Sequence, residues 1–501
     1  MPIVNQCLST KALPLKSALC SIILLLSACT VGPDYQRPST PIDADFKELK
    51  GWKPARPRDE QLQGQWWQVF NDAELNGLVE QVGKKNQSLA QAEAQFRQAQ
   101  AVVQGASAGY FPIVNVSASA NRFRAATGQS VAVSGVRNLF GAALSIAWEP
   151  DLWGAVRRQV ESDQSAAQAS FATWQALKLS TQATLVQTYF QLRTLDAQQH
   201  ILNDTLAAYA KSLEITQNRY AVGVAAQAEV LQAQTQLEAL KAQSVNLGVQ
   251  RSRLEHALAV LIGATPSSVT LTSGALPTAL PAVPVSVPSQ VLERRPDIAG
   301  AERQITAANA KIGIAKAAYF PTVTLSATNG VQSRTISNLI DTAARYWALG
   351  PIAFALPLFD GGAKAAKMAE AEAVYDASIA AYRQTVLTAF QEVEDNLSAL
   401  RILEEESAVQ ARTVEYARKS LALTLNQYKA GTVSYLNVMT AQSTLLDAEQ
   451  IANDLLGQRF NACVLLIKAL GGGWRPADLP SLDDIGGDPT WSQFLPIPLG
   501  R

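Results

Sequence analysis

The stretch of sequence that decides the fold runs from Ala155 to Tyr220 and reads AVRRQVESDQSAAQASFATWQALKLSTQATLVQTYFQLRTLDAQQHILNDTLAAYAKSLEITQNRY. It contains neither proline nor glycine and is rich in Ala, Gln, Leu and Glu, which are strong or neutral helix formers. A continuous helix over this stretch would be about 100 Å long. A globular core does not need such a helix, whereas a coiled-coil-like assembly does.

A second proline-free interval of similar composition lies between Pro357 and Pro476. The first stretch belongs to a proline-free interval between Pro150 and Pro266. Each of the two intervals is interrupted only near one glycine, Gly223 in the first and Gly431 in the second. A glycine between two long helices permits a tight reversal of the chain. We therefore expect two long helical hairpins with these glycines at their tips.

The two halves of the chain repeat the same landmarks in the same order. Tyr110 matches Tyr319 at an offset of 209 residues, and Tyr220 matches Tyr428 at an offset of 208. A nearly constant offset through the whole chain predicts a tandem duplication.

Each half also contains two segments in which apolar and polar residues alternate. The residues that share an apolar face are Val114, Val116, Ala118 and Ala120, then Ala142, Leu144, Ile146 and Trp148, then Val323, Leu325 and Ala327, and finally Ile352, Phe354, Leu356 and Leu358. A period of two over about ten residues is typical of a membrane β-strand of about 9–11 residues. The alternative from the pattern alone is a pair of half-buried hairpins in a soluble sheet.

Four membrane strands cannot close a barrel by themselves, and unpaired strand edges are not tolerated in lipid. Closure would have to come from oligomerisation. Three copies would supply twelve strands, which is an allowed even number.

Composition defines the remaining segments. Each repeat should open with one helix, at about 73–108 and at about 289–317. The expected units are a lipoprotein signal peptide over 1–28, an extended arm over 29–65, a first repeat over 66–270 with a β-hairpin at about 110–150, a proline-rich linker over 271–288, a second repeat over 289–475 with a β-hairpin at about 320–359, and a C-terminal tail over 476–501.

The N-terminus has the features of an export signal. Lys11 and Lys16 precede an apolar run that is too short to span a membrane. The run ends in Leu26-Ser27-Ala28-Cys29, which resembles the bacterial lipobox, so we expect Cys29 to be the lipidated first residue of the mature chain. The alternative is a free cysteine beside an ordinary cleavage site. Thr30 follows instead of the aspartate that usually retains lipoproteins at the inner membrane, which favours the outer membrane.

Composition argues against several functions. Lys+Arg and Asp+Glu each number 42, so zero formal charge argues against a nucleic-acid partner. Two histidines exclude a histidine-rich metal site. No nucleophile, base or metal cluster is evident, so we expect neither an enzyme nor a cofactor. Cys463 lies on an apolar helical stripe and should be a packed core residue.

Two local motifs are best explained by helix ends. Pro296 after two arginines is typical of a helix start, with Asp297 near its positive end. The glycines at 471–473 follow a helix and lack the Lys-Ser/Thr of a phosphate loop, which favours a C-terminal cap.

Several ordered motifs together resemble the outer-membrane factors of tripartite efflux pumps, the TolC-like family, in its lipoprotein (NodT-type) branch. The motifs are Trp66-Trp67, Asp151-Leu152-Trp153-Gly154, Arg294-Arg295-Pro296-Asp297-Ile298, Ala317-x-Tyr319-Phe320-Pro321, Tyr428-x-Ala430-Gly431-Thr432 and Gly471-Gly472-Gly473-Trp474. They cover nearly the whole mature chain.

The resemblance implies an α+β membrane protein. A homotrimer would form a 12-stranded β-barrel, with four strands per chain, continued by a long α-helical barrel in the periplasm. The function implied is a passive outer-membrane duct, lipid-anchored in a Gram-negative bacterium, that exports drugs or other toxic small molecules. The partners implied are outer-membrane lipid, a periplasmic adaptor and an inner-membrane pump of the proton-driven RND type.

The resemblance also implies two kinds of site. The adaptor would dock at the hairpin tips, on Tyr220, Gly223, Tyr428, Gly431 and Thr432. A periplasmic gate would be lined by Glu229, Leu436, Asn437 and Thr440, with a phenol–carboxylate hydrogen bond available between Tyr428 and Glu229. Family members often carry aspartates at the positions of Asn437 and Thr440, and here both residues are neutral.

Two other functions remain open: a non-conducting coiled-coil envelope lipoprotein scaffold, and an outer-membrane duct for type I protein secretion. The paired amphipathic strand segments favour a channel over a scaffold, because a scaffold has no need of them.

Overall fold

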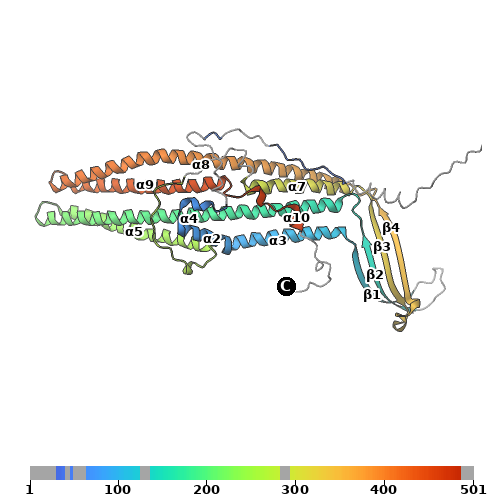
Figure 1. The fold of residues 1–501 in the computed structure, drawn as a ribbon. Helices are drawn as coiled ribbons and strands as arrows, with labels where there is room; N and C mark the ends of the chain where they lie inside the picture. The colour runs from blue at the N-terminus through green and yellow to red at the C-terminus, as the bar shows by residue number, and fades with distance from the viewer. Residues whose placement is uncertain (1–29, 40–45, 49–63, 125–135, 282–293, 487–501) are drawn as a thin grey trace, which may run out of the picture.

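The computed structural model describes residues 30–39, 46–48, 64–124, 136–281 and 294–486. The molecule is elongated, with two long helical hairpins at one end and a four-stranded sheet at the other (Figure 1). The signal peptide expected over 1–28 and the lipidation site Cys29 lie outside the described residues. None of the helices in the described part is both long enough and apolar enough to cross a membrane.

The long helices form as the sequence predicts. The first hairpin consists of α4 (Ala155–Ala221) and α5 (Gln227–Leu261), and the second of α8 (Ala363–Lys429) and α9 (Tyr435–Ala469). Gly223 and Gly431 stand in the turns with φ of 76° and 79°, a left-handed conformation that disfavours other residues. The expected reversals at these two glycines are confirmed.

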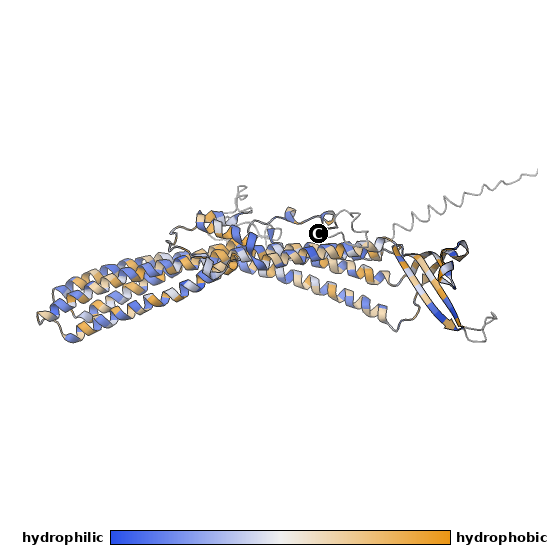
Figure 2. Cartoon of the chain, turned by 90° about the horizontal axis from the view of Figure 1, so that it is seen from below, coloured by the Kyte–Doolittle hydropathy of each residue, from blue (hydrophilic) through white to orange (hydrophobic). Residues whose placement is uncertain are grey.

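The four long helices lie in a row. The closest packing joins α5 to α4, α4 to α9, and α9 to α8. The outer helices of the row are therefore α5 and α8. Figure 2 shows that the hairpins are mostly hydrophilic outside and that hydrophobic residues gather at mid-length, where the helices converge.

The prediction of one continuous helix over 73–108 is wrong. The chain instead forms α2 (Ala73–Lys85) and α3 (Gln87–Ser107), separated at Asn86. The Asn86 backbone is extended, its Oδ1 accepts from the Leu89 amide, and its Nδ2 donates to the Leu261 carbonyl oxygen at 2.8 Å. A side chain that caps one helix while bonding another holds the break in place.

The second repeat opens with α7 (Pro296–Ala317), which starts later than the expected residue 289. Pro296 occupies the first turn and Arg295 before it is extended. Proline disfavours helical backbone in the preceding residue, so the helix cannot extend upstream. The expected start at Pro296 itself is confirmed.

The remaining helical elements are short. They are η2 (Trp66–Phe70), η3 (Ala108–Tyr110), η4 (Pro266–Ser268), η5 (Ile336–Asn338), η6 (Thr342–Ala344), η7 (Pro476–Asp478) and α10 (Leu482–Gly486). The C-terminal α10 packs against α3 and α4 through the buried side chain of Ile485.

The sheet contains β1 (Ile113–Arg124), β2 (Val136–Trp148), β3 (Thr322–Ser333) and β4 (Arg345–Ala355). All neighbours are antiparallel in the order β1-β2-β3-β4. The register pairs Val116 with Leu144 and Leu325 with Ile352, so the expected apolar faces coincide. Leu356 and Leu358 were expected on the same face but lie beyond β4, because Pro357 cannot donate to a strand ladder.

The main core lies at mid-length, where η2 and α2 pack against α4 and α9. Phe190 lies between Phe70 and Phe460, with ring-centroid distances of 4.9 Å and 4.6 Å. Cys463 is buried in the same cluster, as the helical stripe predicts, and burial raises the pKa of its thiol to about 12. The glycine cap is confirmed too, since Gly471 has a φ of 94° directly after α9.

We expect Phe190→Ala to lower the free energy of unfolding by about 3–5 kcal/mol, because it leaves a cavity between two aromatic rings. Phe190→Leu, which retains most of the volume, should cost less than about 1.5 kcal/mol. Chemical denaturation of the detergent-purified protein, followed by helical circular dichroism, measures both. Equal stability of Phe190→Ala and the parent would contradict this description of the core.

Candidate gate at the hairpin tips

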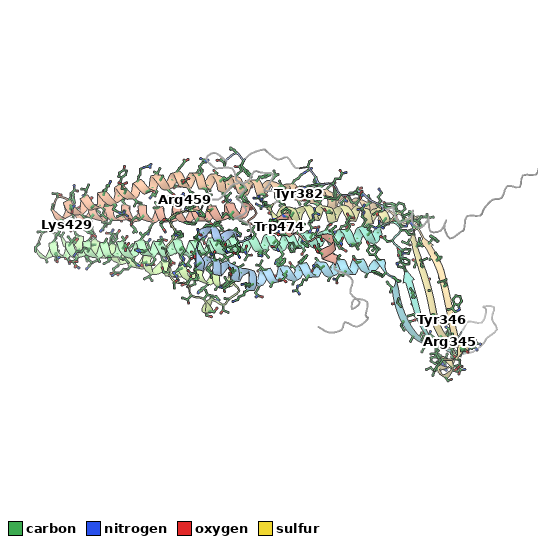
Figure 3. The ribbon with its side chains drawn as sticks, in the orientation of Figure 1. Arg345, Tyr346, Tyr382, Lys429, Arg459 and Trp474 are labelled. Carbon is green, nitrogen blue, oxygen red and sulfur yellow. The ribbon has the colours of Figure 1, made fainter. Side chains whose placement is uncertain are left out.

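The two hairpin tips lie side by side at the end of the molecule farthest from the sheet (Figure 1). Figure 3 shows Lys429 at this end and Arg345 and Tyr346 at the opposite end of the molecule. Every gate and docking residue proposed from the sequence lies at this end of the molecule, in the last turns of α4 and α8, in the two connecting turns, or in the first turns of α5 and α9.

The two turns share two backbone hydrogen bonds. Gly223 N donates to Tyr220 O at 2.9 Å, and Gly431 N donates to Tyr428 O at 3.0 Å. In the first turn Val224 N donates to Arg219 O at 2.9 Å. In the second turn Thr432 N donates to Gln427 O at 3.0 Å. The two tips therefore have matching backbones and differ in their side chains.

The matching tyrosines have opposite environments. Tyr220 is 46% exposed, whereas Tyr428 is 2% exposed and lies between the two hairpins. Tyr428 belongs to a small tip cluster with Ala233, Tyr435 and Val438, and its ring meets that of Tyr435 edge-on at 5.7 Å. The Tyr428 side chain is thus covered by its own chain, unlike the other docking candidates Tyr220, Gly223, Gly431 and Thr432, which are exposed.

The Tyr428 hydroxyl joins the second hairpin to the first. It lies 3.2 Å from the Glu229 carboxylate, to which it donates, and 3.1 Å from the Thr216 hydroxyl. Burial raises the pKa of the Tyr428 phenol; the Thr216 hydrogen bond opposes this shift and the Glu229 charge adds to it. The phenol–carboxylate hydrogen bond proposed from the sequence is present, and it lies within one protomer.

Polar contacts extend this junction below the tip. Gln442 on α9 donates to the Ser212 hydroxyl on α4 at 2.8 Å, and both residues are buried. Sequence reasoning missed Thr216, Ser212 and Gln442, although single polar residues within apolar helical stripes were a visible signal. Buried polar pairs of this kind set the register between long helices.

The remaining gate candidates point away from this junction. Leu436 is 52% exposed, and Asn437 and Thr440 are exposed on the first turns of α9. Thr440 borders an open groove of about 720 Å³ between α5 and α9, whose lining includes one carboxylate, Asp447. The structure therefore separates Leu436, Asn437 and Thr440, on the exposed face, from the Tyr428–Glu229 bond.

The opposite end of the helices holds the start of the described chain. Val31 N donates to Trp153 O at 3.3 Å, and Arg157 donates to the Thr30 hydroxyl at 2.5 Å. Asp34 forms an ion pair with the buried Arg158 at 3.0 Å. The residue that follows Cys29 is thus held beside the junction of β2 and α4.

Within the described residues, no group of three or more His, Cys, Asp or Glu side chains is arranged to hold a metal ion. Arg295, which precedes the helix start at Pro296, is buried and paired with Asp297 and Glu392. Its role is structural.

The fold combines long helical hairpins with a sheet that has open edges, and hydrogen bonds join the hairpin tips. This combination defines an outer-membrane channel of the efflux class. The sequence profile of the family described as Outer membrane efflux protein matches residues 78–264 and 287–472, and the chain belongs to this family.

Individual relatives are similar to this chain along almost their whole length. The chain is 30% identical to the toluene efflux pump outer membrane protein TtgF of Pseudomonas putida over 94% of this chain and 98% of that protein. It is 31% identical to the antibiotic efflux pump outer membrane protein ArpC of Pseudomonas putida, over 90% and 94% of the two chains. The solved structure of the outer-membrane channel OprN is similar with a TM-score of 0.84 and 32% identity, over 89% of this chain and 100% of that chain. These relatives favour the channel over the scaffold.

We expect a tyrosine nitration reagent to modify Tyr220 and to spare Tyr428. The phenolate is the reactive form, and burial together with a raised pKa leaves Tyr428 both inaccessible and protonated at mildly alkaline pH. Peptide mass spectrometry of the folded protein reads both sites, and denatured protein is the control in which both react. Equal nitration in the folded state would show that the tips do not pack as described.

Proposed function

We propose that the chain is the outer-membrane channel subunit of a tripartite efflux pump, a passive duct for small toxic molecules. The observation that carries the proposal is that the sheet and the row of long helices both have open edges. β1 and β4 each have one strand neighbour, and α5 and α8 are the outer helices of their row.

Copies of the chain would close both layers. Unpaired strand edges are costly in lipid, so β1 of one protomer should pair with β4 of the next. Helix α8 also exposes four apolar residues at a spacing of seven, which is typical of a coiled-coil seam: Ile402, Val409, Tyr416 and Leu423. We propose a homotrimer with a twelve-stranded β-barrel and a continuous helical barrel, built from a tandem repeat with the unit boundaries given above.

The relatives suggest the cargo and the partners. TtgF is named for toluene efflux and ArpC for antibiotic efflux, so we propose small apolar and amphiphilic compounds as cargo. A periplasmic adaptor would contact the exposed tip residues Tyr220, Gly223, Gly431 and Thr432. An inner-membrane pump, of the proton-driven RND type, would supply the energy.

The tip would act as the gate. In a trimer, the Tyr428–Glu229 bond would occur three times, and a hydrogen bond to a charged group is worth about 1.5–3 kcal/mol. Opening then requires an adaptor that binds the open form better by a comparable amount. Leu436, Asn437 and Thr440, exposed on α9, would line the closed aperture.

The protein would sit in the outer membrane of a Gram-negative bacterium. A lipid on Cys29 fits the position of Thr30, which is held at the sheet end of α4. The acyl chains would enter the same membrane as the strands.

In planar bilayers we expect the purified channel to give stepwise current that is small in the closed state. The pair Glu229→Ala with Tyr428→Phe should raise the open probability and the leakage of a large antibiotic into cells, because it removes the bond between the tips without touching the sheet. The control is Tyr220→Phe, the exposed counterpart of Tyr428. An absence of any stepwise current would contradict the channel function.

We expect mass spectrometry of the mature protein to find an acylated Cys29 as its first residue. Cys29→Ala should still assemble, because strand pairing supplies most of the insertion energy. A mature terminus at another residue, or an unmodified cysteine, would contradict the anchor.

A further inference from the structure

Arg219, near the end of α4, reaches from the first hairpin to the end of α8 in the second. Its Nη1 donates to the carbonyl oxygens of Tyr428 at 2.8 Å and Lys429 at 3.1 Å. Its guanidinium lies over the Tyr428 ring, with Cζ 4.7 Å from the centroid. The last carbonyls of a helix have no partner within it and attract positive charge, and a guanidinium can donate and stack at once.

The turn itself does not need this arginine. The first tip closes with the same backbone hydrogen bonds, yet no side chain in the described part of the chain donates to its matching carbonyls, those of Tyr220 and Ala221. The position that matches Arg219 in the second hairpin is Gln427, which is exposed. Arg219 therefore links the two hairpins and does not serve to close either one.

The two sets of contacts to Tyr428 use different atoms. The hydroxyl lies against Thr216 and Glu229, whereas Arg219 binds the main-chain oxygen and the face of the ring. Phenylalanine at this position would retain everything that Arg219 contacts. The two links are therefore separable by mutation.

We propose that Arg219 is a second latch of the closed tip, independent of the Tyr428–Glu229 bond. The proposal rests on the proposed channel function. When the second hairpin moves away from the first, the two carbonyl bonds and the ring contact must break together. Arg219 is a positioning residue: it holds the end of α8 in place and so biases the channel toward its closed state.

Single-channel recording of the full-length protein in planar bilayers tests the latch. Arg219→Ala should raise the open probability about tenfold, as expected for the loss of charge-assisted hydrogen bonds. Arg219→Lys retains the charge but not the planar fork, and should give an intermediate value. Combining Arg219→Ala with Tyr428→Phe should give a higher open/closed ratio than either single variant, because each substitution removes a different hydrogen bond. Arg219 contacts the Tyr428 ring, so the double-mutant cycle also measures the coupling between the two links.

Two control variants separate the latch from general loosening of the tip. Gln427→Ala changes the matching position of the other hairpin, and Lys211→Ala removes an exposed cation of α4 that pairs with Glu214. Both should behave like the parent, and native electrophoresis should show the same oligomer for all variants. If Arg219→Ala fails to assemble, Arg219→Gln takes its place.

Three results would overturn the latch: parental open probability in the Arg219 variants, an equal rise in Gln427→Ala, or a double variant no more open than Tyr428→Phe alone. If the Arg219 variants stay closed while Glu229→Ala with Tyr428→Phe opens the channel, the proposed function stands and only the latch fails. If no protein gives stepwise current, the proposed function itself fails.

Discussion

The rest of the structure depends on the unpaired backbone groups along the outer edges of β1 and β4. Among the described residues each of these strands has one strand neighbour, so a row of N–H and C=O groups on its outer edge has no strand partner there. In lipid such groups must be satisfied by another strand. We therefore propose that the chain is one part of a closed wall made by several copies. The helical row fits the same proposal, because α5 and α8 are its outer helices.

The two hairpin tips have similar backbones but different side-chain environments. The two turns share glycine geometry and backbone hydrogen bonds, but one tyrosine faces outward and the other inward. The first hairpin has Arg219 where the second has Gln427, so the side chain at this position links the hairpins only from the first to the second. The second hairpin is thus held by the first at a few polar contacts.

Much of the fold was predictable from local pattern. The absence of proline and glycine between Ala155 and Tyr220 predicted α4 almost to the residue. The Tyr428–Glu229 hydrogen bond was available from the gate residues that the family resemblance implies, and it is present. Two misplaced ends, the start of α7 and the end of β4, are set by the local prolines Pro296 and Pro357. The other misses depend on tertiary contacts. The break at Asn86 is held by a hydrogen bond to Leu261, which lies far away in sequence. Arg219 was missed for the same reason, since the carbonyl groups that it binds belong to the other hairpin.

The central claim is that the described sheet and helical row are one share of a closed wall made by copies of this chain. Native mass spectrometry of the detergent-purified protein tests it most directly. We expect one folded species that contains three chains and that dissociates only together with loss of the sheet. A stable, folded monomer with all four strands intact would contradict the claim.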